Sequence, residues 1–276
     1  AIAVLHKFLF LFETIVGEKT MKKSLIALAL VGAFAAPAFA EEAAAPASEH
    51  TITGNLGLFS SYRFRGIDQT FGKPALQGGF DYSHASGFYV GNWNSNVSQT
   101  AGYPDGNLEM DFYAGYKTTF GDFGLDVGGL YYYYPGSRGQ TLGLNRGAVD
   151  NGELYVAGSW KFLTLKYSYA VTDYFSAKDT DGTSYLELNA AYDLGDGWGI
   201  NGHVGHLYAR NMPSAADYTD WKLGVTKDVG GFVFGLSYVD TNADKGFYTS
   251  SPAMHSGGDT KNLGRGTAVL SVSKTF

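Results

Sequence analysis

The amino-acid sequence predicts an all-β fold, a transmembrane antiparallel up-and-down β-barrel of about 12 strands preceded by a signal-peptide helix. Three observations predict this class. Residues 265–276 alternate between apolar and polar side chains and end in Phe276, as the last strand of an outer-membrane barrel does. An export signal occupies residues 21–40. Aromatic residues make up 16% of the chain while the mean hydropathy is only −0.11, because half of each strand must face lipid and half a polar lumen.

The export signal begins at Met21. Lys22 and Lys23 supply its positive end, residues 25–34 its apolar stretch, and residues 38–40 (Ala-Phe-Ala) a small-x-small cleavage site. A transmembrane helix is the alternative, but the apolar stretch is short for a span and the cleavage residues stand where the helix flank should be. We therefore expect export, with cleavage after residue 40.

Three further segments complete the expected domain organisation. Residues 1–20 end in a Gly-Glu-Lys-Thr run that reads back into purine-rich codons resembling a ribosome-binding site, so we expect them to be a mistranslated upstream segment. Residues 41–50 are rich in alanine and are expected to form a disordered leader. Residues 51–276 are expected to form the outer-membrane barrel.

Composition excludes several kinds of protein. Residues 41–276 carry 16 Lys and Arg against 24 Asp and Glu, a net charge of −8, which argues against a nucleic-acid partner. The sequence contains no cysteine, so disulfides and thiolate metal sites are excluded. We expect no cofactor and no bound metal.

Segments with a two-residue period, lying between turn signals, predict twelve strands. They are residues 51–67, 74–84, 88–97, 107–118, 124–134, 152–161, 163–172, 184–194, 199–208, 219–227, 231–241 and 266–276. The connections between them are alternately tight and long, and the longest is residues 242–265. Short turns at one end and long loops at the other are typical of an up-and-down membrane barrel, whose short turns are periplasmic.

Charged side chains are almost confined to one face of the predicted strands. On the fourth strand, for example, Leu108, Met110 and Phe112 oppose Glu109 and Asp111. A charge that faces lipid at the bilayer midplane costs about 2 to 4 kcal/mol. This sorting of charges also fixes the strand register, because a one-residue slip would turn each of these charges into lipid.

Aromatic residues gather at the ends of the apolar runs. Trp160, Phe162 and Trp198 lie near the short turns, and Tyr62, Phe64, Tyr133, Tyr208 and Trp221 lie near the long loops. A soluble all-β protein, such as a periplasmic sandwich or a lipocalin-like barrel, would also alternate. It would place its apolar face inside and leave no reason for these aromatic ends, so the pattern favours the membrane barrel.

Five segments resemble a known family. Residues 61–67 (SYRFRGI), 74–82 (PALQGGFDY) and 87–93 (GFYVGNW) are similar to the opening of the TorF-type porins, a proteobacterial group often described only as conserved proteins of unknown function. Residues 108–113 (LEMDFY) and 272–276 (VSKTF) are similar too, so the resemblance spans the exported chain. It implies an outer-membrane location and a pore without an established solute.

The inward-facing polar residues of the predicted strands are the pore-lining candidates. They are Arg63, Arg65, Asp81, Asn92, Asn94, Glu109, Asp111, Lys117, Glu153, Lys166, Glu187, Asp220 and Lys222. The two arginines are predicted near the outer end of the first strand, across from acidic residues on other strands, an arrangement that would set up a transverse field. The alternative, that these charges pair and fill the interior, stays open. The two asparagines, with Asn96, form a polar row that either hydrogen-bonds sugars or amides or simply lines the lumen.

Three sharper sites are weighed and set aside. Residues 179–182 (DTDG) resemble the start of a calcium loop but lack its further ligands. His203 and His206 are three residues apart on a predicted strand, which sends them to opposite faces and argues against a shared metal. His206 and Ser184 suggest a lipid hydrolase, but no nucleophile turn or set of oxyanion donors accompanies them.

The sequence therefore predicts a non-enzymatic, outer-membrane channel for passive diffusion of small hydrophilic solutes or ions, with the acidic excess favouring cations or neutral solutes. A closed structural or surface-interaction barrel is the alternative, and a lipid hydrolase is a distant third. The expected partners are outer-membrane lipid and lipopolysaccharide, the barrel-assembly machinery through the strand ending in Phe276, and a second copy in a homo-oligomer. The sequence leaves open the permeant solute, the oligomeric state and whether residues 242–265 fold inward as a plug.

Overall fold

A computed structural model describes residues 48–103, 105–138, 147–250 and 259–276. The predicted upstream segment 1–20, the export signal 21–40 and the leader up to residue 47 lie outside the described residues. No helix within the described ranges is both long and apolar enough to cross a membrane.

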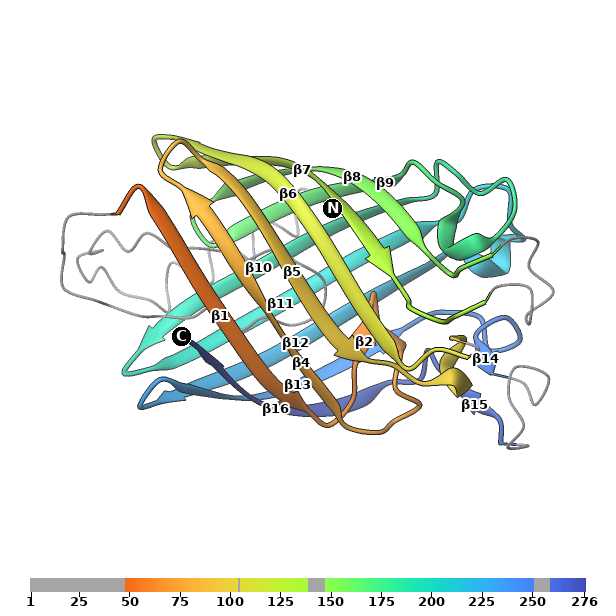
Figure 1. Ribbon diagram of the computed structural model, residues 1–276. Helices are drawn as coiled ribbons and strands as arrows, with labels where there is room; N and C mark the ends of the chain where they lie inside the picture. Colours follow the sequence, from red (N-terminus) through yellow and green to blue (C-terminus); the bar gives the residue numbers. More distant parts are fainter. Residues whose placement is uncertain (1–47, 104, 139–146, 251–258) are drawn as a thin grey trace, which may run out of the picture.

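Twelve antiparallel strands close into a barrel (Figure 1). They are β1 (His50–Phe59), β4 (Ala75–His84), β5 (Phe88–Asn96), β6 (Leu108–Phe120), β7 (Phe123–Tyr133), β8 (Asn151–Trp160), β9 (Leu163–Ala170), β10 (Ser184–Gly195), β11 (Trp198–Tyr208), β12 (Tyr218–Val229), β13 (Phe232–Thr241) and β16 (Thr267–Thr275). Each pairs with the next of these strands along the chain, and β1 closes the ring on β16 with Asn55 opposite Thr275. The predicted all-β, twelve-stranded up-and-down barrel is confirmed.

Alternation of side chains explains both the strands and their orientation. In β9, Thr164, Lys166 and Ser168 are buried, whereas Leu165 and Tyr167 between them are exposed. Successive side chains of a strand point to opposite faces of the sheet. The polar set therefore points into the barrel and the apolar set points outward, which is the reverse of a soluble β-protein.

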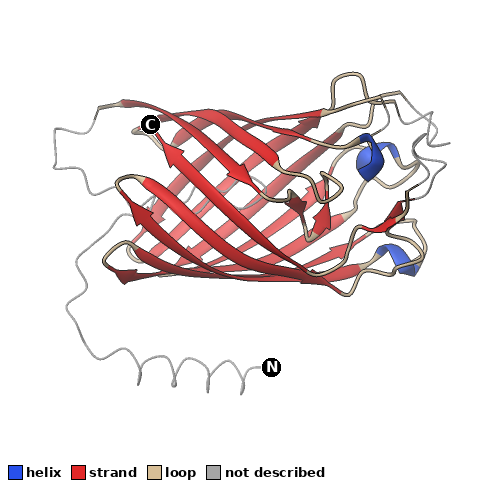
Figure 2. Cartoon of the chain, turned by 90° about the horizontal axis from the view of Figure 1, so that it is seen from below, coloured by secondary structure: helices blue, strands red, loops and turns tan. Residues whose placement is uncertain are grey.

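The two ends of the barrel differ in their connections. At one end, which we call the short-turn end, hairpins close tightly, as between Phe120 and its partner Phe123. At the other, the long-loop end, lie the 3₁₀ turns and a small strand pair (Figure 2). These elements are η1 (Gln99–Ala101), η3 (Tyr174–Ser176), η4 (Ser214–Ala216), β14 (Thr249–Ser250) and β15 (Lys261–Asn262). Strand β1 begins and β16 ends at the short-turn end.

The first predicted strand, residues 51–67, is wrong beyond residue 59. Strand β1 ends at Phe59, and the chain then folds into the barrel as a short hairpin of β2 (Arg63–Phe64) and β3 (Ile67–Asp68), seen within the outline of the wall in Figure 1. We call residues 60–74 the first loop. Tyr62 and Phe64, predicted to face outward, are instead 1% and 9% exposed. The prediction was wrong because Tyr62 and Phe64 continue the apolar-polar alternation of β1 after that strand has left the wall.

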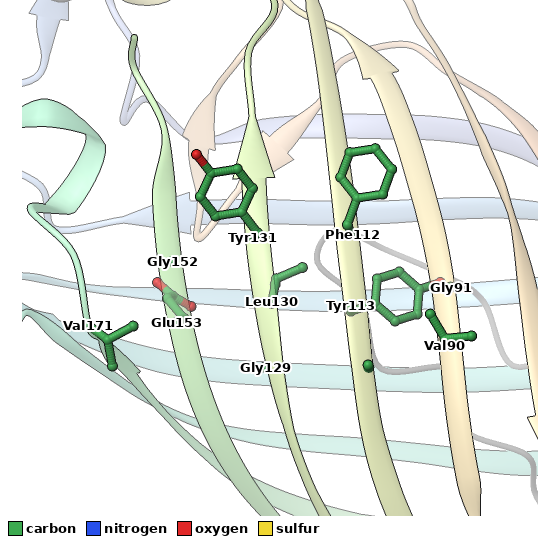
Figure 3. A pocket seen from close by; sticks show the side chains of 11 residues that line it. Val90, Gly91, Phe112, Tyr113, Gly129, Leu130, Tyr131, Gly152, Glu153 and Val171 are labelled. Atoms are coloured by element: carbon green, nitrogen blue, oxygen red, sulfur yellow. The ribbon is translucent and has the colours of Figure 1, made fainter. Parts of the chain in front are cut away.

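The outer face is apolar and includes a shallow depression of about 430 Å³ over strands β5 to β8 (Figure 3). Ala114, Gly129 and Gly152 line it without bulky side chains, and Phe112 and Tyr131 stand beside it. Both rings are on the outward parity, with 45% and 43% of their surface exposed. The depression is therefore a feature of the outer wall and not an opening into the lumen.

Candidate pore lumen and the loop that fills it

The structure places the predicted pore-lining residues in three positions. Nine lie on the inner face of the wall: Asp81, Glu109, Asp111, Lys117, Glu153, Lys166, Glu187, Asp220 and Lys222. Arg63 and Arg65 are enclosed too, but on the first loop instead of the wall, which corrects the prediction that they end the first strand. Asn92 and Asn94 are on the outer face.

The outward placement of Asn92 and Asn94 is a second correction. Asn92 pairs with Phe80 and Phe112, which are exposed on the outer face, while its neighbour Trp93 is buried inside. Residues directly opposite one another on paired strands share a face. The Asn92 and Asn94 side-chain amides donate to the backbone carbonyls of Asp111 and Gly78, at 3.0 and 3.3 Å. These local bonds satisfy amides on an otherwise apolar wall, a possibility that alternation alone did not reveal.

The first loop crosses the lumen near the long-loop end. Tyr62 donates its hydroxyl to Glu109 Oε1 at 3.0 Å, and its ring packs edge-on against Trp93 with 5.5 Å between centroids. Phe64 packs edge-on against Tyr132 and Phe175. The loop thus reaches from β1 to strands β5, β6 and β7, which lie two to four strands away in the ring.

Arg65 anchors the tip of the first loop. Its guanidinium donates to both carboxylate oxygens of Glu153, at 3.0 and 2.7 Å, and to the Tyr174 hydroxyl at 3.0 Å. The same group lies 4.4 Å from the centroid of the Tyr185 ring. Burial raises the pKa of Tyr174, so its hydroxyl stays neutral and can accept this bond. The predicted charges at this level therefore pair with each other, which favours the reading that they fill the interior.

A second ionic contact joins the first loop to the last long loop. Asp68, fully buried, accepts from Lys261 Nζ at 2.8 Å and lies 3.6 Å from Arg63. Arg63 also donates to the backbone carbonyls of Leu263 and Arg265, at 3.0 and 3.2 Å. The described part of the 242–265 loop thus packs against the first loop. Among the described residues, the first loop lies inside the barrel, whereas residues 251–258 of the loop that the sequence left open as a plug lie outside the described residues.

The hairpin turn places Arg65 and Gly66 at its two central positions. Both have positive φ, 46° and 80°, and Phe64 pairs with Ile67, which is a two-residue hairpin of the type that favours glycine at its second position. A Cβ added at Gly66 would lie 2.6 Å from Asp220 Cβ. The turn therefore fits against the wall of β12 only because residue 66 has no side chain.

Two buried carboxylates lie under the first loop. Glu109 and Asp111 are both 0% exposed and share the inner face of β6. Among the described residues, Asp111 has no hydrogen-bond partner for either carboxylate oxygen, and Glu109 has none for Oε2. Burying such groups without partners costs free energy that hydration would restore. The loop is thus seated on groups that favour contact with water.

Toward the short-turn end, tyrosine rings lie against the wall. Tyr89 donates to Asp126 Oδ1 at 2.6 Å and also bonds the Tyr155 hydroxyl. A Cβ at Gly91 would come within 2.6 Å of the Tyr113 ring, so that ring covers a strand position without a side chain. These rings belong to the same buried cluster as Tyr62 and Phe64 of the first loop.

Lysines follow this aromatic wall. Lys117 lies 3.7 Å from Asp126 and 4.5 Å from the centroid of the Tyr89 ring, and Lys166 lies 4.3 Å from that of Tyr155. Lysine over an aromatic face is attracted by the ring quadrupole. The inner wall at this level therefore carries lysines over aromatic faces, together with two carboxylates, Asp126 and the Asp81 group that accepts from the Tyr113 hydroxyl.

His203 forms a polar cluster that the sequence analysis did not assemble. Its ring nitrogens lie 2.7 Å from Asn189 Oδ1 and 3.0 Å from Asp220 Oδ1, and Glu187 is 3.6 Å away. Tyr185 donates to Asp220 Oδ2 at 2.7 Å. The alternation on β11 predicted that His203 faces inward. It did not predict that side chains of β10, β11 and β12 come together around this histidine.

Neither of the other weighed constellations assembles. His206 faces outward, bonded to Thr219 Oγ1 at 2.9 Å, and lies opposite Leu186, whereas Ser184 lies opposite Tyr208. In the 179–182 loop, the Asp181 carboxylate lies 3.3 Å from Arg210. The serine and histidine are thus out of register, and the loop carboxylate is held by a cation.

Comparison with known proteins gives a family and a set of structural likenesses. The family described as "bacterial protein of unknown function (Gcw_chp)" matches residues 43–276. No curated protein matches the sequence. The TorF-type assignment itself is not confirmed.

The comparison with solved structures gives distant likenesses. The chain is similar to the KdgM porin (TM-score 0.49, 9% identity, 82% of this chain and 97% of that chain) and to the NanC porin (0.46, 10%, 82% and 99%). It is also similar to OccAB4 of Acinetobacter baumannii (0.40, 13%, 82% and 62%). Likenesses this distant carry no argument about a solute. What the match over residues 43–276 does show is that this chain is a member of the Gcw_chp family of bacterial proteins.

Proposed function

We propose that this protein is a porin-like, non-enzymatic channel of the bacterial outer membrane for passive diffusion of small hydrophilic solutes or ions, and that the first loop holds it closed in the state described. The single observation that carries this proposal is the sorting of side chains. Lys166, Asp126 and Glu153 are buried, with at most 7% of their surface exposed, while Leu165 and Leu223 are 52% and 63% exposed on the outer face. That arrangement is stable in a barrel that has lipid outside and water inside, because apolar side chains then meet lipid and charged side chains avoid it.

The orientation follows from the loops. The short-turn end faces the periplasm and the long-loop end faces outward, as in other barrels of this class. The first loop then closes the outer half of the lumen. The resemblance to TorF-type porins supports the same assignment, and the acidic excess of the chain supports passage of cations or neutral solutes over anions.

The first loop has the character of a removable plug. Phe59 pairs directly with Ala75, so a tight hairpin would complete the wall without residues 60–74. Its contacts with the wall include hydrogen bonds and ion pairs that water can replace, such as those between Arg65 and Glu153. Its Tyr62 also bonds Glu109, which shares the inner face of β6 with the partnerless carboxylate of Asp111. If the first loop were displaced, water would therefore replace its hydrogen bonds and ion pairs with the wall.

Conductance in planar lipid bilayers tests the proposal. We expect the refolded wild-type protein to give rare, salt-dependent steps, and a variant with residues 61–73 replaced by a short Gly-Ser turn to give frequent and larger ones. A matched control replaces residues 210–214, an exposed loop outside the lumen. If both variants fold, judged by heat-dependent mobility on gels, and the plug-shortened variant still conducts nothing, the channel proposal is wrong.

A closed structural or surface-interaction barrel is the second candidate. The observation that favours it is the burial of the first loop, in which Tyr62, Asp68 and Thr70 are at most 1% exposed. Such a barrel would remain silent in bilayers even without the loop, so the same experiment separates the two functions.

Three partners are proposed on the same grounds. Outer-membrane lipid and lipopolysaccharide would cover the apolar outer face, including the depression beside Phe112 and Tyr131. The barrel-assembly machinery would bind the last strand, β16, and the terminal Phe276. A second copy of the chain is a third proposed partner, tested by cross-linking in detergent.

A further inference from the structure

Two histidines and a glutamate meet at the rim of the short-turn end, away from the lumen. His50 at the start of β1 lies directly opposite His84 at the end of β4, and their ring centroids are 5.1 Å apart. The backbone amide of Ala85 donates to the Glu49 carbonyl at 2.9 Å, which brings Glu49 to the same rim. One ring nitrogen of each histidine and one carboxylate oxygen of Glu49 all lie within 4.8 Å of one another.

We propose that Glu49, His50 and His84 form a binding site for a divalent transition-metal ion of the zinc type. Imidazole nitrogen and carboxylate oxygen are ligands that zinc takes, commonly three from the protein with water as the fourth. Ligand atoms around tetrahedral zinc, at about 2.0 to 2.2 Å from the ion, are roughly 3.3 Å apart. Side-chain rotations that shorten the observed separations, each at most 4.8 Å, by no more than about 1.5 Å would complete the site.

The surroundings of the two rings support metal binding. His50 Nδ1 lies 2.8 Å from the Tyr82 hydroxyl, and His84 Nδ1 lies 2.8 Å from Ser86 Oγ. A histidine that binds a metal through one nitrogen usually donates the other N–H to an oxygen, which fixes the ring. Both Nδ1 atoms have such an oxygen, which leaves Nε2 of each ring for the metal. For His84 this requires the tautomer that donates to Ser86, in place of the one that accepts from the Ser86 amide at 3.1 Å.

The position of the site suggests what it would do. Glu49 belongs to the leader that precedes the barrel, whereas His50 and His84 belong to neighbouring wall strands. All three residues are exposed or partly exposed, so an ion can reach them from solvent. A bound ion would tie the end of the leader to the β1–β4 edge.

Calorimetric titration with Zn²⁺ tests the site, on untagged barrel protein beginning at residue 41, treated with a chelator and kept in detergent. We expect one saturable site per chain. His50→Ala and His84→Ala should each weaken binding by about tenfold or more, and Glu49→Gln should weaken it less. The control is His206→Ala, another exposed histidine on the outer face, which should bind as the wild type does.

Two results would overturn the metal site. One is the absence of saturable zinc binding by the folded wild-type protein. The other is equal zinc affinity for the wild type and for both His50→Ala and His84→Ala. Because the residues lie at the exposed rim, the variants should keep the heat-dependent gel mobility of the folded barrel, which checks that a loss of binding is not a loss of structure.

Discussion

The outer and inner halves of the lumen carry the same kinds of inward side chain but bury them to different degrees. In the outer half, Glu109, Asp111 and Asp220 are at most 2% exposed. In the inner half, the side chain of Lys117 is 42% exposed, and Ser271 and Ser273 are partly exposed. Burial in the inner half is uneven, because Asp126 and Lys166, beside the Tyr89 and Tyr155 rings, are only 7% and 6% exposed. In the outer half, the first loop covers the inward side chains together with Tyr103, Tyr134 and Phe175. Strand parity decides which side chains face the lumen, and the segments at the long-loop end bury those of the outer half.

Among the substitutions considered, removal of the Arg65 guanidinium should have the largest effect on the first loop and so on the burial of the outer half of the lumen. Arg65→Ala leaves Glu153 buried and without its bidentate partner, which typically costs about 3 to 5 kcal/mol. We expect either a large fall in the free energy of unfolding, measured by urea titration in lipid vesicles, or release of the first loop, measured as greater conductance. Arg65→Lys keeps the charge but loses the paired N–H donors of the guanidinium, so its stability and conductance should lie between those of the wild type and Arg65→Ala. If Arg65→Ala had the free energy of unfolding and the conductance of the wild type, the contact between Arg65 and Glu153 would not anchor the tip of the first loop.

A side chain added at Gly66, in the turn of the first loop, should have the next largest effect on stability and channel opening. Gly66→Ala adds a Cβ at φ 80° and 2.6 Å from Asp220 Cβ, so the hairpin must move away from β12. We expect a destabilisation of about 1 to 3 kcal/mol and more frequent channel opening. Gly230→Ala is the matched control, because Gly230 also has positive φ but a Cβ there would meet nothing within 4 Å. Similar behaviour of the two variants would mean that backbone strain, and not contact with the wall, limits residue 66.

Loss of one hydrogen bond under the loop should have a smaller effect. Tyr62→Phe keeps the ring against Trp93 but removes the donor to Glu109, which is expected to cost about 1.5 to 3 kcal/mol if the carboxylate is charged and less if it is neutral. The free energies of unfolding of the wild type, Tyr62→Phe, Glu109→Gln and the double variant, compared in a double-mutant cycle, measure the coupling of the two groups. A coupling energy near zero would remove this contact from the account of how the loop is held.

The smallest effect is expected in the inner half. Lys117→Gln breaks a partly exposed ion pair with Asp126, and such pairs contribute about 0 to 1 kcal/mol. Stability should change little, whereas the ion selectivity of the plug-shortened channel should shift further toward cations because one positive charge leaves the inner wall. Reversal potentials in a salt gradient measure the shift. Unchanged selectivity would mean that Lys117 does not face the permeation path.

Alternation in the sequence determined the wall of this protein. Eleven of the predicted strands coincide with β4 to β13 and β16 within a few residues, because a two-residue period with charge on one face specifies both a strand and its register. The inward placement of Glu109, Lys166 and Asp220 follows from the same period. Asn92 and Asn94 also keep the period, on the outward parity of Phe88 and Val90. The prediction placed them inward because they are polar, but neighbouring carbonyls accept their hydrogen bonds on the outer face.

Tertiary structure alone decided what fills the lumen. Residues 61–67 continue the alternation of β1, and this alternation does not distinguish a strand that stays in the wall from a loop that turns inside. The Arg65-Gly66 turn is the one local signal, and its meaning depends on Glu153 and Asp220, which are distant in the sequence. The pairing of Asp68 with Lys261 across the chain is of the same kind. A periodic pattern records which face of a strand meets lipid, whereas contacts between loops and the opposite wall form only when the barrel closes.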